Sequence, residues 1–451
     1  METKNWIRLD NASNIFLAAR NNIDTKVFRL TVELLEIVNP NILQQALTRI
    51  YEEYPLFHSV LRRGIFWYYL EKSEVNPRVQ LETTAPVQDI YEEGSKNFMF
   101  RVFYKENRIH LEVFHALTDG TGAMWFFEDL VTEYIRLQYQ LEEEQEYAVT
   151  SREKEDLEDS FRRYFREKKD RIRKDRFYDP LKKFMRFDSS KGSFFVNPFE
   201  QPSNKNVYQI KGTYTPDNRP RIVNVHMPVK EALALAREMD VSLTIYMTAV
   251  YILSVYETKE AKEQETTVSV SIPINLRQLF PSTTVRNFFS TTTVDYTFIE
   301  GEEPNLYAIC QAINEQFKPQ LEKEGLENRL RRYVEFETIP AARVIPRPLK
   351  DLVLKGINAV NNRSITVAMS NLGRVNLPEE TKKHIQNLYF YTSVIRPQFC
   401  MISYNDTLNI TFTSPFLETD LFKHFVRFFT HKGIEVVLDV NKVTSKELNE
   451  G

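Results

Sequence analysis

The sequence is poor in the residues that build several common functional sites. Only two cysteines, Cys310 and Cys400, occur in 451 residues, and they lie far apart, so the chain offers neither a disulfide framework nor a zinc-ligand cluster. Glycine is scarce at 12 residues, and no Gly-x-Gly-x-x-Gly or Walker-type loop is present. Glycine-rich loops usually bind nucleotide phosphates, so the sequence does not favour a nucleotide-dependent reaction of the common kinds.

Neither positive nor negative charge predominates in the sequence. The 59 basic and 62 acidic side chains leave a net charge of −3, which gives no long-range attraction to nucleic acid or to an anionic membrane. The N-terminal residues lack the apolar core of a signal peptide, so we expect a cytoplasmic protein. The apolar run at 243–255 is shorter than the ~20 residues that span a bilayer, which predicts a buried core helix and no transmembrane segment.

The length and the order of patterns predict two α/β lobes. A chain of 451 residues suits two domains of about 150–220 residues each. Residues 1–145 alternate strand and helix patterns, and a similar order starts again at 207, so we expect an N-terminal lobe at 1–145 and a C-terminal lobe at 207–451. The segment 146–206 is dense in mixed charge, which is typical of a solvated helical connector and crossover; a lid over a substrate channel is the alternative.

One of the seven histidines stands out by its position. His115 follows a predicted strand, Arg108–Phe114, and opens a turn that contains Asp119 and Gly120. Strand ends that face a crevice between elements are where reactive groups tend to be presented. Histidine has a pKa near neutrality and suits proton transfer to and from a substrate. A plain turn histidine, with Asp119 and Gly120 as turn formers, is the structural alternative.

The segment His115-Ala-Leu-Thr-Asp119-Gly120 resembles the His-x-x-x-Asp-Gly signature of the chloramphenicol acetyltransferase-like and condensation-domain superfamily. Ser271–Arg277 is similar to the family's strand and loop ending in arginine, and Met369–Gly373 is similar to the Asn-Leu-Gly segment of its alcohol acetyltransferase branch. Phe114 stands where condensation domains usually carry a further histidine, which makes the alcohol acetyltransferase branch the better match.

This resemblance implies a fold, an activity and a set of site residues. The fold is a two-lobed sandwich, each lobe a mixed sheet covered by helices, with an active-site channel between the lobes. The activity is transfer of an acyl group, expected to be acetyl, from acyl-CoA as cosubstrate to an alcohol or amine, with an acyl-carrier protein as an alternative donor. His115 is the implied general base, while Asp119, Gly120 and Arg277 support the catalytic loop through an Asp119–Arg277 ion pair. Ser370 and Asn371 are candidates for the oxyanion site or the channel.

Three rival functions stay open at this point. A metal hydrolase could use His110, His115 and Asp119, but no His-Glu-x-x-His pattern supports it, and we expect neither a metal nor a permanently bound cofactor. A catalytically inactive binding or scaffold protein would keep the same fold. A condensation enzyme that depends on carrier proteins is the third.

Overall fold

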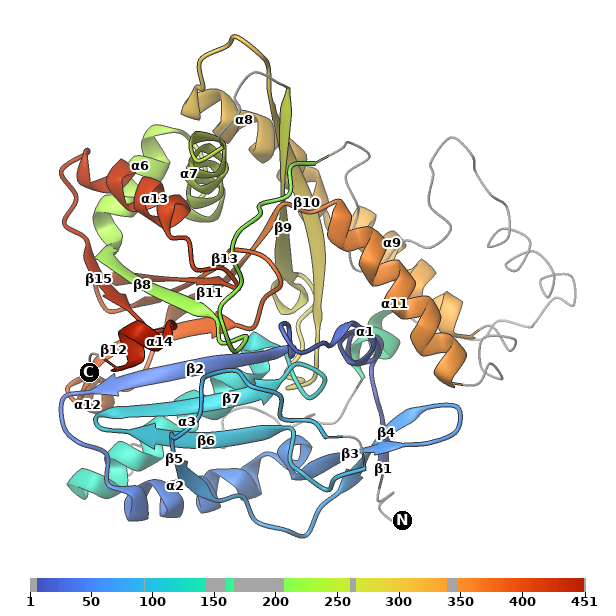
Figure 1. The fold of residues 1–451 in the computed structure, drawn as a ribbon. Helices are drawn as coiled ribbons and strands as arrows, with labels where there is room; N and C mark the ends of the chain where they lie inside the picture. The colour runs from blue at the N-terminus through green and yellow to red at the C-terminus, as the bar shows by residue number, and fades with distance from the viewer. Residues whose placement is uncertain are drawn as a thin grey trace, which may run out of the picture.

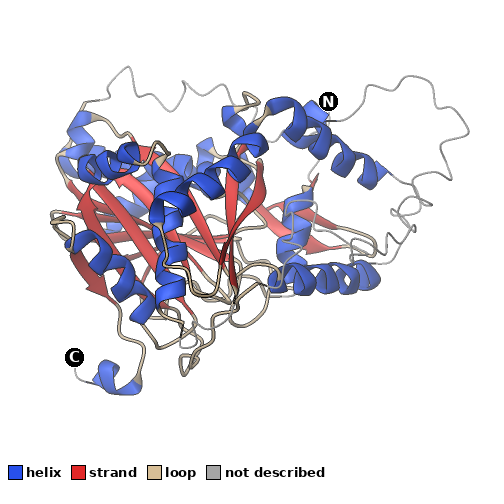
Figure 2. Ribbon diagram, turned by 90° about the horizontal axis from the view of Figure 1, so that it is seen from above, coloured by secondary structure: helices blue, strands red, loops and turns tan. Residues whose placement is uncertain are grey.

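The computed structural model describes residues 6–92, 94–142, 159–165, 207–259, 265–338 and 347–449. Two large mixed β-sheets, of five and seven strands, lie next to one another with helices on their outer faces, and a three-stranded sheet completes the fold (Figure 1). Seen from above, the strands run through the interior and the helices surround them (Figure 2). The expected architecture of two mixed sheets covered by helices is therefore confirmed.

The five-stranded sheet has the order β12-β2-β7-β6-β5, and its strands are β2 (Val27–Leu34), β5 (Val79–Leu81), β6 (Phe100–Lys105), β7 (Arg108–Phe114) and β12 (Ile385–Thr392). Two helices, α2 (Pro40–Glu53) and α3 (Gly120–Tyr139), contribute their apolar faces to its core. α2 begins where the sequence predicts, because the Asn39 side chain accepts hydrogen bonds from the backbone of Asn41 and Ile42 and proline occupies the first helical position.

The seven-stranded sheet has the order β10-β9-β11-β13-β14-β8-β15. Its strands are β8 (Arg221–Pro228), β9 (Thr266–Asn275), β10 (Phe289–Phe298), β11 (Val367–Val375), β13 (Gln398–Tyr404), β14 (Thr407–Ser414) and β15 (Val437–Val440). The helices of its core are α6 (Val229–Glu238), α7 (Leu243–Glu257), α8 (Leu306–Phe317) and α13 (Asp420–Thr430). α7 is buried on nearly all sides, so the apolar run in the sequence is a core helix.

Strand β13 contributes side chains to the separate cores of both lobes. Along β13, Phe399 and Met401 pack with α7 in the second lobe, whereas Cys400 and Ile402 pack with the residues of the first. One strand also crosses between the lobes, because β12 pairs antiparallel with β2 of the first sheet. The sheets therefore do not follow the linear division at 145 and 207, since β12 belongs to the range 207–451.

The described chain also contains a third sheet and further α-helices. They are the three-stranded sheet of β1 (Trp6–Arg8), β3 (Ser59–Arg63) and β4 (Tyr68–Lys72), and the helices α1 (Asn11–Ala19), α4 (Ser160–Phe165), α9 (Lys323–Thr338), α11 (Arg347–Arg363), α12 (Glu379–Lys382) and α14 (Ser445–Asn449). The predicted connector at 146–206 lies outside the described residues except for 159–165. Among the helices that are described, none is long and apolar enough to cross a membrane alone, and α6 with α7 meets that test only as a pair bent by 83°.

Candidate active site

His115 directly follows β7 and is enclosed by parts of both lobes. Its backbone N–H donates to the carbonyl of Lys26, 2.8 Å away, which fixes the start of the turn against the residue before β2. Aromatic rings from three elements surround the imidazole. They are Phe16 of α1, stacked at 4.0 Å between ring centroids, Phe28 of β2, edge-on at 5.1 Å, and Phe289 of β10 at 5.7 Å.

The side chain of Asn287 determines which imidazole nitrogen carries the proton. Asn287 Nδ2 lies 3.0 Å from the carbonyl oxygen of His115, and Asn287 Oδ1 lies 3.3 Å from His115 Nδ1. A backbone carbonyl only accepts hydrogen bonds, so the amide nitrogen must face it and the amide oxygen must face the ring. His115 Nδ1 therefore donates, and Nε2 keeps its lone pair. No residue of the described chain hydrogen-bonds to Nε2.

The surroundings of His115 favour its neutral form. Burial lowers the pKa of His115 to about 4, against the opposing effects of the Asp119 carboxylate and the Asn287 hydrogen bond. At neutral pH the imidazole is thus uncharged and able to accept a proton. If the ring becomes protonated during a reaction, the nearby Asp119 charge stabilises it.

A second set of polar contacts ties Asn287 to α1. Asn287 Nδ2 also lies 3.2 Å from Ser13 Oγ, which in turn is 2.7 Å from Asp10 Oδ1 and 2.8 Å from the carbonyl oxygen of Ala116. Asp10 caps α1 by accepting from the backbone of Ser13 at 2.8 Å. These contacts hold α1 against the turn that carries His115, and with it the ring of Phe16.

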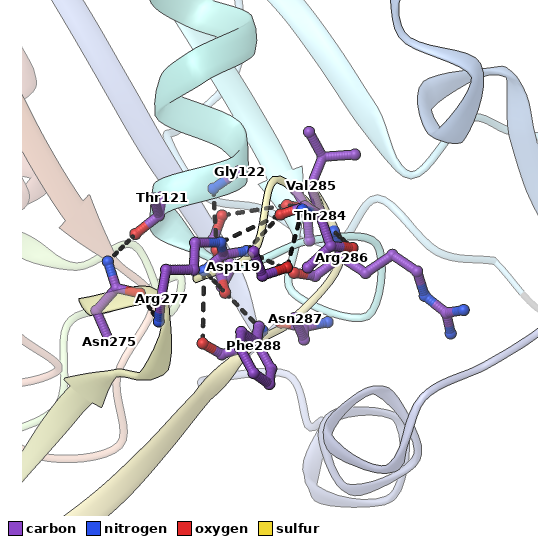
Figure 3. A network of polar contacts seen from close by, with 12 residues as sticks. Asp119, Thr121, Gly122, Asn275, Arg277, Thr284, Val285, Arg286, Asn287 and Phe288 are labelled. Carbon is purple, nitrogen blue, oxygen red and sulfur yellow. Dashed lines mark hydrogen bonds and ion pairs between the residues drawn. The ribbon is translucent and has the colours of Figure 1, made fainter. Parts of the chain in front are cut away.

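Asp119 and Arg277 form a buried ion pair between the two lobes (Figure 3). Arg277 Nη1 lies 2.8 Å from Asp119 Oδ2, and both side chains are less than a tenth exposed. The same carboxylate caps α3 by accepting from the backbone of Gly122 at 2.9 Å, and it accepts from the backbone of Phe288 at 2.8 Å. Its hydrogen bonds go to these groups and not to His115.

Arg277 uses its remaining donors to hold the segment just before β10. Its guanidinium donates to the carbonyl oxygens of Thr284, at 2.9 and 3.1 Å, and of Arg286, at 2.7 Å (Figure 3). This segment includes Asn287, so the ion pair and the imidazole are linked through one short stretch of chain. Arg277 therefore positions both Asp119 and the partner of His115.

The two glycines after Asp119 lie at close approaches between the lobes. A Cβ atom on Gly120 would lie 2.8 Å from a methyl carbon of Leu372, the flexible end of a side chain on β11. A Cβ atom on Gly122 would collide with the backbone carbonyl of Val285 and with Thr118 Oγ1. Gly122 is thus the more restricted of the two, although the signature in the sequence singles out Gly120.

Ser370 and Asn371 lie on β11, and the structure does not bring either into contact with His115 among the described residues. Ser370 is partly buried and is in register with Cys400, whose side chain belongs to the core of the first lobe. Asn371 is exposed, and its amide donates to Thr244 Oγ1 at 3.0 Å and accepts from the backbone of Gly373 at 2.8 Å.

His110 has different partners from the other residues of the proposed metal set. Its Nδ1 lies 2.9 Å from Thr31 Oγ1, while Asp119 binds Arg277 and His115 faces Asn287. Within the ranges that the structure describes, no group of three potential metal ligands converges. The geometry offers nothing that favours the metal-hydrolase alternative.

A family model described as alcohol acetyltransferase matches residues 95–414, well over half of the chain and including His115, Arg277 and Ser370. The chain belongs to the alcohol acetyltransferase family. It is an acyltransferase, as the signature around His115 predicts. No curated protein matches it.

Solved structures show that this alcohol acetyltransferase family member has the two-lobed condensation-type fold. It is similar to the trichothecene 15-O-acetyltransferase from Fusarium sporotrichioides, with a TM-score of 0.60, 12% identity and 94% of each chain covered. It is also similar to polyketide synthase associated protein 5 from Mycobacterium tuberculosis, with a TM-score of 0.57, 14% identity and coverage of 93% of this chain and 96% of that one. A third is a mutant of the starter condensation domain of rhizomide synthetase in complex with C8-CoA, with a TM-score of 0.56, 12% identity and coverage of 94% of this chain and 93% of that one.

Proposed function

We propose that this acyltransferase moves an acyl group, acetyl in the simplest case, from a coenzyme A thioester to an alcohol or amine, with His115 as the general base. One observation carries the proposal. Asn287 holds the proton of the imidazole on Nδ1, which leaves the Nε2 lone pair available between the two lobes. A neutral histidine with one nitrogen oriented by a hydrogen bond is the arrangement that general-base catalysis requires.

The reaction would proceed by direct transfer between the two substrates. Nε2 takes the proton from the acceptor hydroxyl or amine as its oxygen or nitrogen bonds to the thioester carbonyl carbon. The tetrahedral intermediate then collapses, the carbon–sulfur bond breaks, and Nε2–H returns the proton to the leaving thiolate. Binding both substrates beside one base removes the entropy cost of their encounter from the chemical step.

The two cysteines do not suit the alternative of a covalent acyl-enzyme. Both are buried, and burial raises the pKa of Cys310 to about 11 and that of Cys400 to about 12. A thiol acts as a nucleophile in its thiolate form, which is scarce at neutral pH under these conditions. This supports a mechanism in which His115 activates the acceptor itself.

We assign to the supporting residues the roles that the resemblance implies. Asp119 and Arg277 fix the turn after His115 through their ion pair, and Gly120 allows α3 to approach β11. Of the two candidates for the oxyanion site, Ser370 is favoured, because Asn371 is exposed and one N–H of its amide already bonds to Thr244, whereas Ser370 is partly buried.

Coenzyme A is the proposed donor carrier, as cosubstrate and not as a permanently bound cofactor. The complex of the rhizomide synthetase domain with C8-CoA, which shares this fold, is consistent with that choice. Screening acyl-CoA chain lengths against a panel of alcohols and amines, with release of free thiol as readout, tests the proposal. If turnover occurs only with an acyl-carrier protein, that protein and not coenzyme A carries the donor acyl group. If no donor supports turnover, the result favours an inactive binding protein.

A further inference from the structure

Most of the described apolar side chains of helix α11 lie on its outer side. Four aliphatic side chains are exposed: Leu349 at 53%, Leu352 at 66%, Val353 at 37% and Val360 at 51%. Gly356 and Ala359 lie on the same side and are exposed as well. The spacing of three, four and seven residues places these positions in one stripe along the helix.

Two polar residues on the inner side of α11, Lys350 and Asp351, hold the helix in this orientation. Lys350 Nζ lies 3.7 Å from the ring centroid of Trp67 and 3.3 Å from the carbonyl oxygen of Phe66. Tyr68 donates its hydroxyl hydrogen to Asp351 at 3.2 Å. A surface helix normally turns its apolar stripe toward the core, whereas α11 turns only Leu354 of its described aliphatic side chains inward.

The turn between β3 and β4 continues this apolar surface. Ile65 and Phe66 in that turn are 77% and 42% exposed, and Lys350 connects the turn to the first helical turns of α11. Figure 1 shows α11 at the edge of the molecule with the β3–β4 hairpin below it. We call this surface the α11 face; it consists of Leu349, Leu352, Val353, Val360, Ile65 and Phe66.

Positive charges lie around the α11 face. Lys355 and Arg363 are exposed on the helix, and Arg63 is exposed at the start of the hairpin turn. The one acidic residue of α11, Asp351, accepts from Tyr68. Burial raises the pKa of its carboxyl, and Lys355 and Arg63 lie close enough to oppose that rise, so Asp351 offsets part of this positive charge. Aliphatic and aromatic side chains edged by Lys and Arg match a membrane interface, where the apolar groups enter the acyl chains and the cations meet lipid phosphates.

We propose that the α11 face docks on the surface of an anionic phospholipid bilayer. The helix lies in the plane of the interface with its stripe buried among the upper acyl carbons, and Ile65 and Phe66 enter beside it. Lys355, Arg363 and Arg63 supply the preference for anionic headgroups. Because the whole chain carries a net charge of −3, the attraction is local and short-ranged, so binding falls as salt is added.

Sedimentation of the full chain with lipid vesicles tests this proposal without any enzyme assay. We expect binding to vesicles of phosphatidylcholine mixed with phosphatidylglycerol, and little binding to phosphatidylcholine alone. Leu352→Ser with Val353→Ser should lower the partition coefficient by about tenfold or more, since two buried aliphatic groups are lost. Lys355→Gln with Arg363→Gln should lower it by about tenfold on anionic vesicles only.

A matched control is available on β15. Val437 and Leu438 are 57% and 49% exposed, so Val437→Ser with Leu438→Ser makes the same kind of change away from the α11 face and should leave vesicle binding unchanged. Thermal unfolding of each variant checks that its fold is intact. The proposal is overturned if the wild-type chain does not bind anionic vesicles. It is also overturned if the double-serine variant of α11 binds these vesicles as well as the double-serine variant of β15. It is also overturned if the wild-type chain is a dimer and the variant with Leu352→Ser and Val353→Ser is a monomer. The α11 face would then be a contact between two copies of the chain.

Discussion

Asn287 contacts His115 at two points, accepting from Nδ1 of the ring and donating to the residue's own carbonyl oxygen. The two contacts fix the ring orientation and the tautomer together. One side chain from the second lobe thus leaves Nε2 of a histidine in the first lobe free to accept a proton. An amide in this position orients the imidazole without adding charge. The pKa of His115, lowered to about 4 by burial, is consistent with a neutral partner.

Removing the imidazole should abolish most of the activity while the fold persists. We expect His115→Ala to lower kcat/KM by roughly 10²–10⁴, the usual effect of losing a general base. His431 is exposed on the surface, so His431→Ala is a control that should match the wild type. Thiol release and circular dichroism measure the two effects. Turnover near the wild-type level in His115→Ala would remove His115 from the mechanism.

The pH dependence should report the lowered pKa of His115. Because the neutral form accepts the proton, kcat/KM should be flat around neutral pH and fall only as the pH approaches about 4. Asn287→Asp places a carboxylate beside Nδ1, which favours the imidazolium and raises the pKa of His115. The acidic limb of the profile should therefore move to higher pH in this variant. A wild-type limb centred near the ordinary histidine value of about 6.5 contradicts the lowered pKa of His115. No upward shift in Asn287→Asp contradicts the contact between residue 287 and Nδ1.

The ion pair between Asp119 and Arg277 should behave as one unit. Removing one partner of a buried pair leaves the other charge uncompensated, which typically costs about 3–5 kcal/mol. Asp119→Asn and Arg277→Ala should each lower both the free energy of unfolding and the activity, and the double variant should be little worse than either. Denaturant unfolding of the four proteins measures the coupling. Additive losses would mean that the two side chains stabilise the site independently.

Substitutions at the two glycines should differ in severity. Gly122→Ala forces a methyl group against the backbone of Val285, whereas Gly120→Ala meets the movable end of Leu372. We expect Gly122→Ala to lose activity and stability strongly, and Gly120→Ala to be the milder change. Unfolding midpoints and thiol-release rates provide the comparison, with each variant serving as the control for the other. The reverse order would show that α3 and β11 are packed less flexibly than α3 and the Val285 segment.

Local patterns in the sequence predicted many elements but not their long-range partners. The strand at Val27 and the helix after Asn39 follow from alternation and capping, which are local signals. The pairing of β12 with β2 could not be read in this way, since it joins segments that are distant in the sequence. The Asp119–Arg277 contact was available only through the family resemblance, because charge alone does not select a partner among 59 basic side chains.

The residues around His115 could also be predicted only in part from local sequence patterns. Asp10 and Ser13 form a helix cap that a search for capping residues could have found, and α1 carries Phe16 to the imidazole. Asn287 has no such signal, because a single asparagine after an arginine is typical of any polar loop. Its importance depends on the folding of the segment from Thr284 to Phe288 around Arg277.

Strand β12 lies late in the chain but pairs with β2, so the five-stranded sheet cannot be complete until most of the chain has been synthesised. During synthesis, β2 and β7 leave the ribosome early, but the edge of β2 that β12 covers stays unpaired until residue 392 has been made. An open strand edge is a site for wrong pairing with other chains, and contacts between distant segments form slowly. A fragment that ends before β12 would therefore be prone to aggregate, both through this open edge and because it also lacks β13, β14 and β15 of the second sheet.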